Sequence, residues 1–286
     1  MRNKSLSSLI ICALCLPLLV AAAQPTAAHQ AARDGARRDQ PNSTRVQKGV
    51  ALLDWSHMED LDTLHASLYY GWGEYCGSRP NCLNMVRDWD SLPKACYPTL
   101  LLGNEPTNAE PAGHPIEASV AASMTLQIEA ACPKTQIIAA NIHLNNGDGS
   151  DALNWLHAYL AAYKTQAGHA YGGHNLLGLH CYAYDAATCI NRVQTLEASL
   201  TEYTGHFWIT ETDIVSFYPD AAQQLQSLLS YYASDPRIDW VFVFTNRTAD
   251  WLSLVNNDGS LNASGAVYAS WTGQSWHTYL PVVANH

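Results

Sequence analysis

Eight short apolar segments recur along the chain, and each suits a β-strand that is buried on both faces. In Leu100-Leu101-Leu102-Gly103-Asn104-Glu105-Pro106, a wholly apolar run ends in a polar trio, and Pro106 cannot continue the strand. A second segment, His206-Phe207-Trp208-Ile209-Thr210-Glu211, also ends in a glutamate. The eight expected strands are Val50–Trp55, Ser67–Trp72, Met85–Trp89, Thr99–Asn104, Gln136–Ile142, Leu176–Tyr182, Phe207–Glu211 and Trp240–Thr245.

Helical patterns fill several of the gaps between these strands. The expected helices cover Ile116–Ala131, residues 150–168 between the cap Ser150 and the stop Gly168, Val193–Tyr203, a segment opened by Pro219, and Gly265–Trp271. Residues 84–98 are too few for a full helix after the third strand. Strand–helix alternation predicts a parallel sheet, and eight such units close into a single-domain (β/α)8 TIM barrel of the α/β class, which typically needs about 250 residues.

The two ends of the chain differ from this central pattern. Residues 1–23 resemble a secretory signal peptide, with basic residues at the start, an apolar core and Ala21-Ala22-Ala23 for cleavage. Residues 24–48 lack an apolar period and are predicted to be a flexible leader. The barrel is assigned to residues 49–286, including an apolar tail, Trp276–Val283, that either covers the barrel or serves as a cell-surface handle. We therefore expect a secreted, extracellular protein without a membrane span in the mature chain.

Charge narrows the range of partners. The chain has 15 basic and 25 acidic side chains, and residues 1–48 contain 7 and 2 of them, so residues 49–286 carry a formal charge of −15. Nucleic acid is therefore a poor candidate partner. Few charges and many Trp and Tyr residues favour a neutral, ring-shaped ligand, such as a polysaccharide or oligosaccharide.

Six cysteines remain after signal cleavage, and an even number in a secreted chain predicts disulfides. Cys96 and Cys132 precede neighbouring strands, which lie about 4.8 Å apart, so they are the preferred pair. Cys76 and Cys82 bracket a short loop at the carboxyl end of the strands. Cys181 faces away from His180 and Tyr182, toward the helices, where Cys189 can meet it. A zinc site is disfavoured because paired C-x-x-C spacings are lacking.

Two strand-end glutamates on one barrel face are what double-displacement glycoside hydrolysis requires: Glu105 as acid/base and Glu211 as nucleophile. A strand-end glutamate taken alone is more often a rim residue or an ion-pair partner, so the prediction rests on the pair. The acid role predicts a raised pKa for Glu105, caused by the charge of Glu211 and by partial burial. Further candidates for substrate binding end or follow other strands: Trp55, Tyr70, Trp72, Trp89, Asn104, His143, His180 and Tyr182.

Two catalytic carboxyls need no cofactor and no metal, and neither is expected. The competing metal-hydrolase hypothesis pools His57, His143, His180 and Asp213, but the His-x-His after the first strand that such barrels carry is missing. His180 and Tyr182 are two residues apart and so face the same way. In a glycosidase they would orient Glu211 and bind a hydroxyl, and the aromatic strand ends Tyr70 and Trp72 would form a stacking subsite.

Several motifs together resemble a known group of enzymes. Asn104-Glu105-Pro106, His180-Cys181-Tyr182 and Trp208-Ile209-Thr210-Glu211 are similar to the glycoside hydrolase clan A barrels. Leu68-Tyr69-Tyr70-Gly71-Trp72-Gly73 is similar to the second-strand Trp-Tyr-Tyr-Asn-Trp-Gly of the family 128 endo-β-1,3-glucanases, whose catalytic domain is related to fungal alkali-sensitivity-linked proteins. The likeness covers about residues 49–271 and implies Glu105 as acid/base, Glu211 as nucleophile and Asn104 as a ligand of the 2-hydroxyl group.

The chain departs from that family at several positions. Leu68, Gly71 and Cys181 replace a Trp, an Asn and a Trp, and strand eight reads Phe242-Val243-Phe244-Thr245-Asn246 without the usual Trp. Three readings therefore remain open: a monomeric retaining hydrolase that cuts internal β-1,3-glucan bonds, another clan A specificity such as β-mannan or β-xylan, and a non-catalytic polysaccharide-binding wall protein. Retention of both glutamates argues against the last of these, because binding does not require them.

Overall fold

The computed structural model describes residues 45–76, 79–109, 113–144, 150–214, 219–248 and 252–274. These residues all belong to one compact unit, Pro41–His286. The predicted signal peptide, residues 24–44 of the leader and the apolar tail lie outside the described residues. No helix within the described segments has the length and apolar character that crossing a membrane would need.

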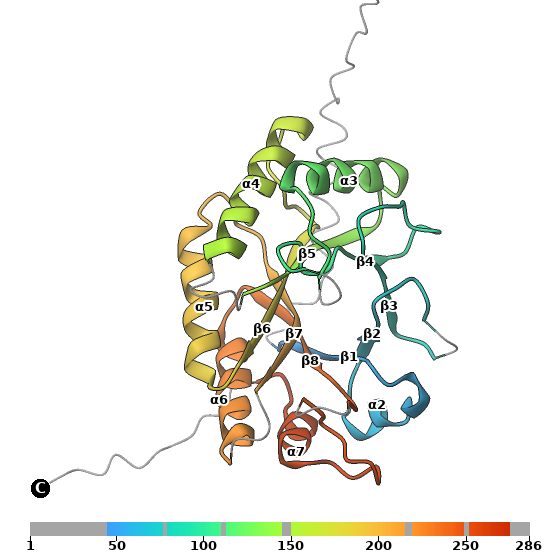
Figure 1. Ribbon diagram of the computed structural model, residues 1–286, viewed down its shortest axis with the longest axis vertical. Coiled ribbons are helices and arrows are strands. Elements are labelled where there is room, and N and C mark those ends of the chain that lie inside the picture. Colours follow the sequence, from blue (N-terminus) through green and yellow to red (C-terminus); the bar gives the residue numbers. More distant parts are fainter. Residues whose placement is uncertain are drawn as a thin grey trace, which may run out of the picture. The chain divides into compact units, whose positions relative to one another are not determined.

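Eight parallel strands form a closed barrel in which each strand pairs with its neighbours in chain order, and β8 pairs with β1 (Figure 1). This confirms the predicted (β/α)8 architecture. The strands are β1 (Gln47–Ala51), β2 (Leu68–Tyr70), β3 (Cys82–Val86), β4 (Thr99–Leu102), β5 (Gln136–His143), β6 (Leu176–Ala183), β7 (Phe207–Ile214) and β8 (Ile238–Phe244).

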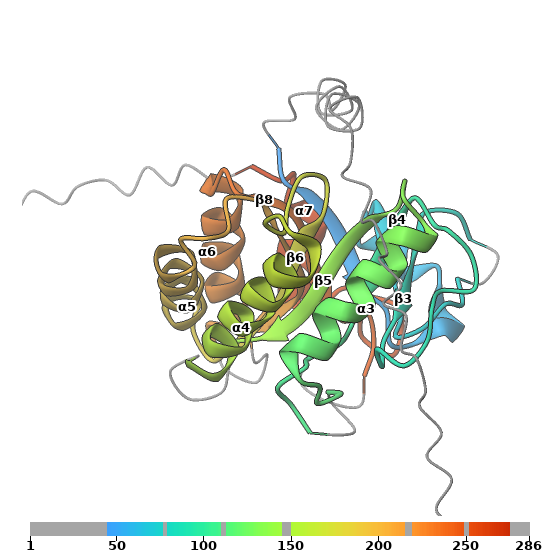
Figure 2. The ribbon, with the colours of Figure 1, turned by 90° about the horizontal axis from the view of Figure 1, so that it is seen from above.

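The longer helices lie outside the strands, as Figure 2 shows for α3 to α7. The helices are η2 (Trp55–His57), α2 (Asp60–Thr63), α3 (Ala118–Ala131), α4 (Ser150–Ala167), α5 (Ala186–Ser199), α6 (Ala221–Ser234) and α7 (Ala263–Ser270). The described residues between β2 and β3, and those between β3 and β4, contain no helix. The short third connection expected from the sequence is therefore confirmed.

Several element boundaries differ from the predictions, and those of α5, β3 and β1 differ for identifiable reasons. α5 begins at Ala186 rather than Val193, because the Asp185 side chain caps it by accepting a hydrogen bond from Thr188 N at 2.7 Å. β3 ends at Val86, since the chain turns away before Trp89, which has a left-handed φ of 57°. β1 begins inside the predicted leader: Lys48 is buried and donates to the carbonyl oxygens of Tyr268 and Ala269 at the end of α7.

Side-chain alternation along the strands separates two cores. The barrel interior contains one apolar residue from most strands, including Tyr70, Leu101, Ile138, Trp208 and Phe242. The flanking residues of the same strands, such as Leu100 and Leu102, pack outward against the helices. A period of two residues explains this separation, because successive side chains of a strand point to opposite faces.

All three predicted disulfides are present. Cys96 pairs with Cys132 and Cys181 with Cys189, with Cα–Cα distances of 5.2 and 5.8 Å. Cys76 pairs with Cys82, but Cys82 is the first residue of β3. This bond therefore joins the loop after β2 to the amino end of the next strand, instead of bracketing a loop at the carboxyl end.

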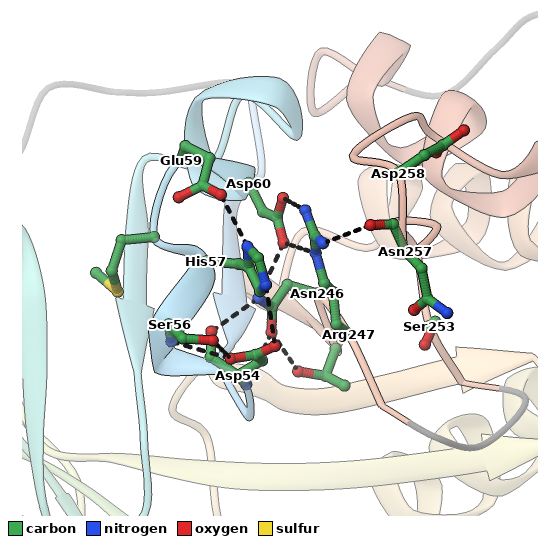
Figure 3. Close-up of polar contacts among 12 residues, drawn as sticks. Asp54, Ser56, His57, Glu59, Asp60, Asn246, Arg247, Ser253, Asn257 and Asp258 are labelled. Atoms are coloured by element: carbon green, nitrogen blue, oxygen red, sulfur yellow. Dashed lines mark hydrogen bonds and ion pairs between the residues drawn. The ribbon is translucent and has the colours of Figure 1, made fainter.

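A polar network joins the first and last units of the barrel (Figure 3). Arg247, which follows β8, donates to both carboxylate oxygens of the buried Asp60 at 2.8 Å. Asn246 donates to Asp60 as well and to the backbone carbonyl of Asp54, which follows β1. A bidentate, buried pair is directional, so this network holds the loops after β1 and β8 in register with each other.

Candidate active site

Glu105 stands just beyond β4, in a turn that requires unusual backbone geometry. Gly103 has a φ of 78°, and a Cβ atom at this position would lie 2.0 Å from the indole ring of Trp89. Glycine is therefore required both by the backbone and by the close approach of that ring. Glu105 itself has a φ of 47°, and residues held in this sparsely populated region cluster at functional sites.

A bulge in β5 holds this turn. The register between β5 and β6 shifts between Ala139 and Ile142. At the bulge, the backbone carbonyl of Asn141 accepts from Glu105 N at 3.0 Å, and its amide donates to Gly103 O at 2.8 Å. Asn141 is not among the site residues expected from the sequence, although a lone Asn within the apolar run Gln136–Ile142 was the available signal.

A second bulge sets the direction of Glu211. In the pairing of β6 with β7, Leu179 faces Ile209 and His180 faces Glu211, so Thr210 is an extra residue. Ile209 packs outward against the helices, and strict alternation would turn Glu211 outward too. One inserted residue reverses the face of everything that follows it, so the Glu211 side chain joins the barrel interior, next to Tyr70.

Three donors hold the Glu211 carboxylate. Oε1 accepts from the Tyr70 hydroxyl and from the Trp72 indole N–H, both at 3.0 Å, and Oε2 accepts from the Tyr182 hydroxyl at 2.5 Å. Tyr70 is fully buried, so its ring offers no face to a sugar. The structure thus uses Tyr70, and the N–H of Trp72, to orient a carboxylate, a role that the sequence suggested only for His180 and Tyr182.

Glu105 faces Glu211 across a shared histidine. His180 Nδ1 lies 2.9 Å from Glu105 Oε1 and 3.4 Å from Glu211 Oε2, and the three side chains are almost completely buried. One oxygen of each carboxyl and a ring nitrogen of His180 lie within 4.8 Å of one another. Glu105 Oε2 also accepts from Asn108 Nδ2 at 2.8 Å, a contact that the sequence did not suggest.

The expected raised pKa of Glu105 was wrong in direction. Burial raises the pKa of this carboxyl, but the hydrogen bond and positive charge of His180, the electrostatic effect of His143 and the hydrogen bond from Asn108 together outweigh burial and lower the pKa. The net result is a pKa below the usual value. Burial and the charge of Glu211 alone would raise the pKa, and the hydrogen-bond donors His180 and Asn108 reverse the direction because they stabilise the carboxylate.

The other two members of the cluster shift upward. Burial raises the pKa of Glu211, and the charge of Glu105 raises it further, against the opposing effects of His180, Tyr182 and Tyr70. Burial lowers the pKa of His180, but the charges of Glu211 and Glu105 outweigh it and raise the net value. A proton in this cluster is therefore held on His180 or Glu211 in preference to Glu105.

The same three residues have the composition of a metal site. Their carboxylates, however, already accept hydrogen bonds from Tyr70, Trp72, Tyr182 and Asn108. These hydrogens occupy lone-pair directions that a cation would use, so the arrangement is that of a proton-handling site. Of the residues in the alternative metal hypothesis, His57 is not a member of this group. It contacts Asp54 and Glu59 (Figure 3).

The remaining candidates divide into two groups. His143 lies beside the pair, because its Nδ1 is 2.9 Å from Asn108 Nδ2 and its ring contacts Tyr182. Asn104 is buried next to Glu105 in the same turn. Trp89 is 2% exposed and packs on Gly103 and Trp155, so it supports the turn and offers no free face.

Trp55 lies farther out, in the turn after β1. It packs edge-on against Tyr69, and its ring centroid is 6.1 Å from that of Tyr75. Tyr75 is 74% exposed. A Cβ atom on Gly71 would lie 2.4 Å from the Trp55 ring, so Trp55 adjoins the residue that precedes Trp72. The two rings therefore provide exposed aromatic surface next to the segment that reaches Glu211.

Comparison with known families gives one match: residues 54–268 match the family described as the glycosyl hydrolase catalytic core. This match includes both glutamates and every residue around them. Among curated proteins, none matches the chain.

Solved structures with the same fold include several β-1,3-glucanases of glycoside hydrolase family 128. A subgroup II endo-enzyme from Sorangium cellulosum has a TM-score of 0.62 and 21% identity, covering 80% of this chain and 99% of its own. A subgroup I endo-enzyme from Amycolatopsis mediterranei, solved with laminaritriose, has the same score and identity over 78% and 98%. A subgroup VI exo-enzyme from Aureobasidium namibiae has a TM-score of 0.60 and 16% identity over 80% and 98%.

Proposed function

This chain belongs to the glycosyl hydrolase catalytic core family, and on that basis we propose that it is a retaining glycoside hydrolase that cuts β-1,3-glucan internally. Glu105 is the acid/base and Glu211 the nucleophile. The observation that carries the proposal is the buried pair of carboxyls bridged by His180, with oxygens no more than 4.8 Å apart.

The spacing favours retention over inversion. Retaining enzymes hold their two carboxyls about 5–5.5 Å apart, whereas inverting enzymes leave about 6.5–9.5 Å for a water molecule. A short gap leaves no room for that water between Glu211 and the sugar. Tyr70, Trp72 and Tyr182 leave Glu211 few rotamers, which favours a fixed nucleophile over a mobile base.

The lowered pKa of Glu105 is compatible with an acid role because His180 can hold the proton and transfer it to Glu105. A protonated His180 with two carboxylates contains as many protons as a neutral His180 with a protonated Glu105. One proton transfer along the 2.9 Å contact between His180 Nδ1 and Glu105 Oε1 interconverts the two states. When a neutral sugar displaces water from the site, the state with three charged groups (protonated His180 and two carboxylates) becomes less favourable. The state with neutral His180 and protonated Glu105 is then favoured, because it contains only the charge of Glu211.

The reaction then follows in two steps. In the first, Glu211 attacks the anomeric carbon, the bond to the leaving oxygen breaks, and Glu105 gives its proton to that oxygen. In the second, the Glu105 carboxylate takes a proton from water, whose oxygen attacks the anomeric carbon and releases Glu211. The second step returns the proton to Glu105 and frees Glu211, so the enzyme ends in its starting state and the reaction needs no cofactor.

The fold neighbours support β-1,3-glucan as the substrate class, and those named as endo-enzymes support internal cleavage. In this proposal, Asn104 binds the 2-hydroxyl group and Trp55 with Tyr75 stacks on a distal sugar ring. The three disulfides agree with an oxidising, extracellular location. We further propose that the mature protein is a secreted monomer.

A panel of polysaccharides tests the substrate. The purified protein is expected to release reducing ends from laminarin and linear β-1,3-glucan, with a mixture of oligosaccharides early in the reaction and little from mannan or xylan. Product sizing over time separates internal cleavage from release of single glucose units at the end. Cleavage of mannan or xylan alone would reject the glucan assignment, and inertness toward every polysaccharide would reject hydrolysis itself.

Trp72 offers a second test, because its N–H contacts Glu211 while its ring could stack on a sugar. Trp72→Phe retains an aromatic face and removes the donor. Since a hydrogen bond to a charged group contributes about 1.5–3 kcal/mol, we expect kcat to fall roughly 10- to 100-fold with a smaller change in KM. Steady-state kinetics on a soluble β-1,3-glucan measures both parameters.

Trp271→Phe is the matched control. Its indole N–H donates to Gln274 O at 3.1 Å, away from the carboxyls. This variant should keep the wild-type kcat even if it is less stable. A Trp72→Phe enzyme with unchanged kcat and raised KM would show that Trp72 acts only as a stacking surface.

A further inference from the structure

Asn108 is placed against Glu105 by the turn that carries both residues. Its backbone N–H donates to Glu105 O at 2.9 Å. Gly113 closes the turn from the other side, since a Cβ atom there would lie 2.4 Å from Glu105 O and 2.6 Å from Asn108 Cβ. The amide of Asn108 therefore has little freedom to leave the carboxyl.

Both hydrogens of this amide are in use. Nδ2 donates one to Glu105 Oε2 at 2.8 Å and the other to His143 Nδ1 at 2.9 Å. The opposite orientation would place the amide oxygen against a carboxylate oxygen, and two acceptors repel each other. The carboxylate of Glu105 thus selects the orientation of Asn108, and Asn108 can only donate to it.

His143 stabilises this orientation of Asn108 by accepting the second amide hydrogen. It can accept from Asn108 only while Nδ1 carries no proton. Burial lowers the pKa of His143 to about 4, so the ring is neutral across the neutral pH range, and the Asn108 N–H that faces Nδ1 assigns the ring proton to Nε2. Its ring also packs edge-on against Tyr182, the donor to Glu211 Oε2. A path of contacts separate from His180 therefore links the two carboxyls.

We propose that Asn108 is a positioning residue for Glu105: its amide, anchored by His143, holds the carboxylate form in place for the water-activating half of the reaction. This inference rests on the proposed function and adds a residue to it. A donor that can serve only the charged form disfavours protonation, so Asn108 assists the base role and opposes the acid role. His180, which can both donate and accept, supplies the proton for the other half.

Other groups also act on Glu105 and must be held constant in a test. The titratable groups that face it are His180 and Tyr182 on β6, His143 on β5, Glu211 on β7 and Tyr70 on β2. Substitutions at position 108 leave these five residues in the chain, so a change in the titration of Glu105 that is shared by a charged and an uncharged variant reports on loss of the amide.

Two variants separate positioning from a structural role. Asn108→Asp keeps the shape and the turn preference of Asn but replaces the donor by an oxygen and adds a charge, and Asn108→Ala removes the donor without adding charge. Asn257→Asp, in an exposed surface turn, is the matched control. If Asn108 served only the turn, the Ala variant would leave the titration of Glu105 as it is in the wild-type protein.

The measurement is a carbon-13 NMR titration of labelled glutamate carboxyls in the free protein, with the Glu105 signal assigned by its loss in Glu105→Gln. We expect the Glu105 titration to move up by about one pH unit or more in Asn108→Asp and by a smaller amount in Asn108→Ala. With an activated aryl glycoside, whose hydrolysis is limited by the second step, the acidic limb of kcat should move up by the same amount.

Titrations of Glu105 that coincide with wild type in both variants would overturn the inference. So would a shift confined to Asn108→Asp, because the added charge alone would then explain it. The NMR titration needs no substrate, so it decides the role of Asn108 even if the protein cleaves no glycan. If the Asn108 variants cleave glycan normally and the acidic limb of kcat stays at the wild-type pH, the positioning role of Asn108 is rejected and the proposed function is unaffected.

Discussion

Glu211→Ala is expected to lose hydrolysis of every glycan by a factor on the order of 10⁴ or more, since no other group can form the covalent intermediate. The structure gives the physical reason. Tyr70, Trp72 and Tyr182 aim this carboxylate from within the barrel. Water admitted into the space left by alanine would lack that orientation, and the remaining carboxyl, Glu105, lies on the opposite side of the sugar and could not take its proton.

Intact-protein mass after reaction with a 2-deoxy-2-fluoro glycoside measures this role. The wild-type protein should gain one glycosyl group, and peptide mapping should place it on Glu211. Glu211→Ala should gain none, whereas Glu202→Ala, in which an exposed glutamate is lost, should label fully. A label on any other residue would overturn the assignment of the nucleophile.

Glu105→Ala is expected to lose polysaccharide cleavage by roughly 10²- to 10⁴-fold, the usual contribution of a general acid. The same variant should still be glycosylated by a substrate with a good leaving group, because that step needs no proton. Its glycosyl-enzyme should then accumulate, since water is no longer activated. Azide, which attacks without a base, should restore turnover.

Rapid-mixing kinetics with an activated aryl glycoside separates these steps. A burst of released phenol followed by a slow phase that azide accelerates is the expected pattern. Equal losses on activated and natural substrates, without a burst and without azide rescue, would show that Glu105 serves the fold or the binding of sugar and not proton transfer.

Much of the frame around these residues could be predicted from sequence patterns. The apolar runs before Glu105 and Glu211 predicted two barrel strands, and Pro106 predicted the end of the first. Alternation along β6 correctly turned Cys181 toward Cys189 and away from His180. These predictions succeeded because they depend on local periodicity and on the chain order of neighbouring strands.

Two predictions that depended on contacts between side chains of different segments were wrong. The pKa of Glu105 was predicted to rise and is lowered, because His180, and to a smaller extent His143 and Asn108, stabilise its charged form. Trp89, assigned to substrate, packs under the turn at Gly103. Position along a strand indicates only which end a residue occupies, and the partners that decide its pKa or its exposure come from other strands.

The sequence by itself determined the eight-stranded barrel, the preferred cysteine pair Cys96–Cys132 and the edge of the barrel at which Glu105 and Glu211 lie. The direction of their side chains was decided by tertiary structure. Strict alternation would put Glu211 on the same face as Ile209, and the extra residue Thr210 turns it inward. The bulge at Asn141 likewise holds the turn of Glu105 through bonds to the end of β4. A bulge leaves no mark in a period of two, because its stability comes from the neighbouring strand that accepts the extra residue.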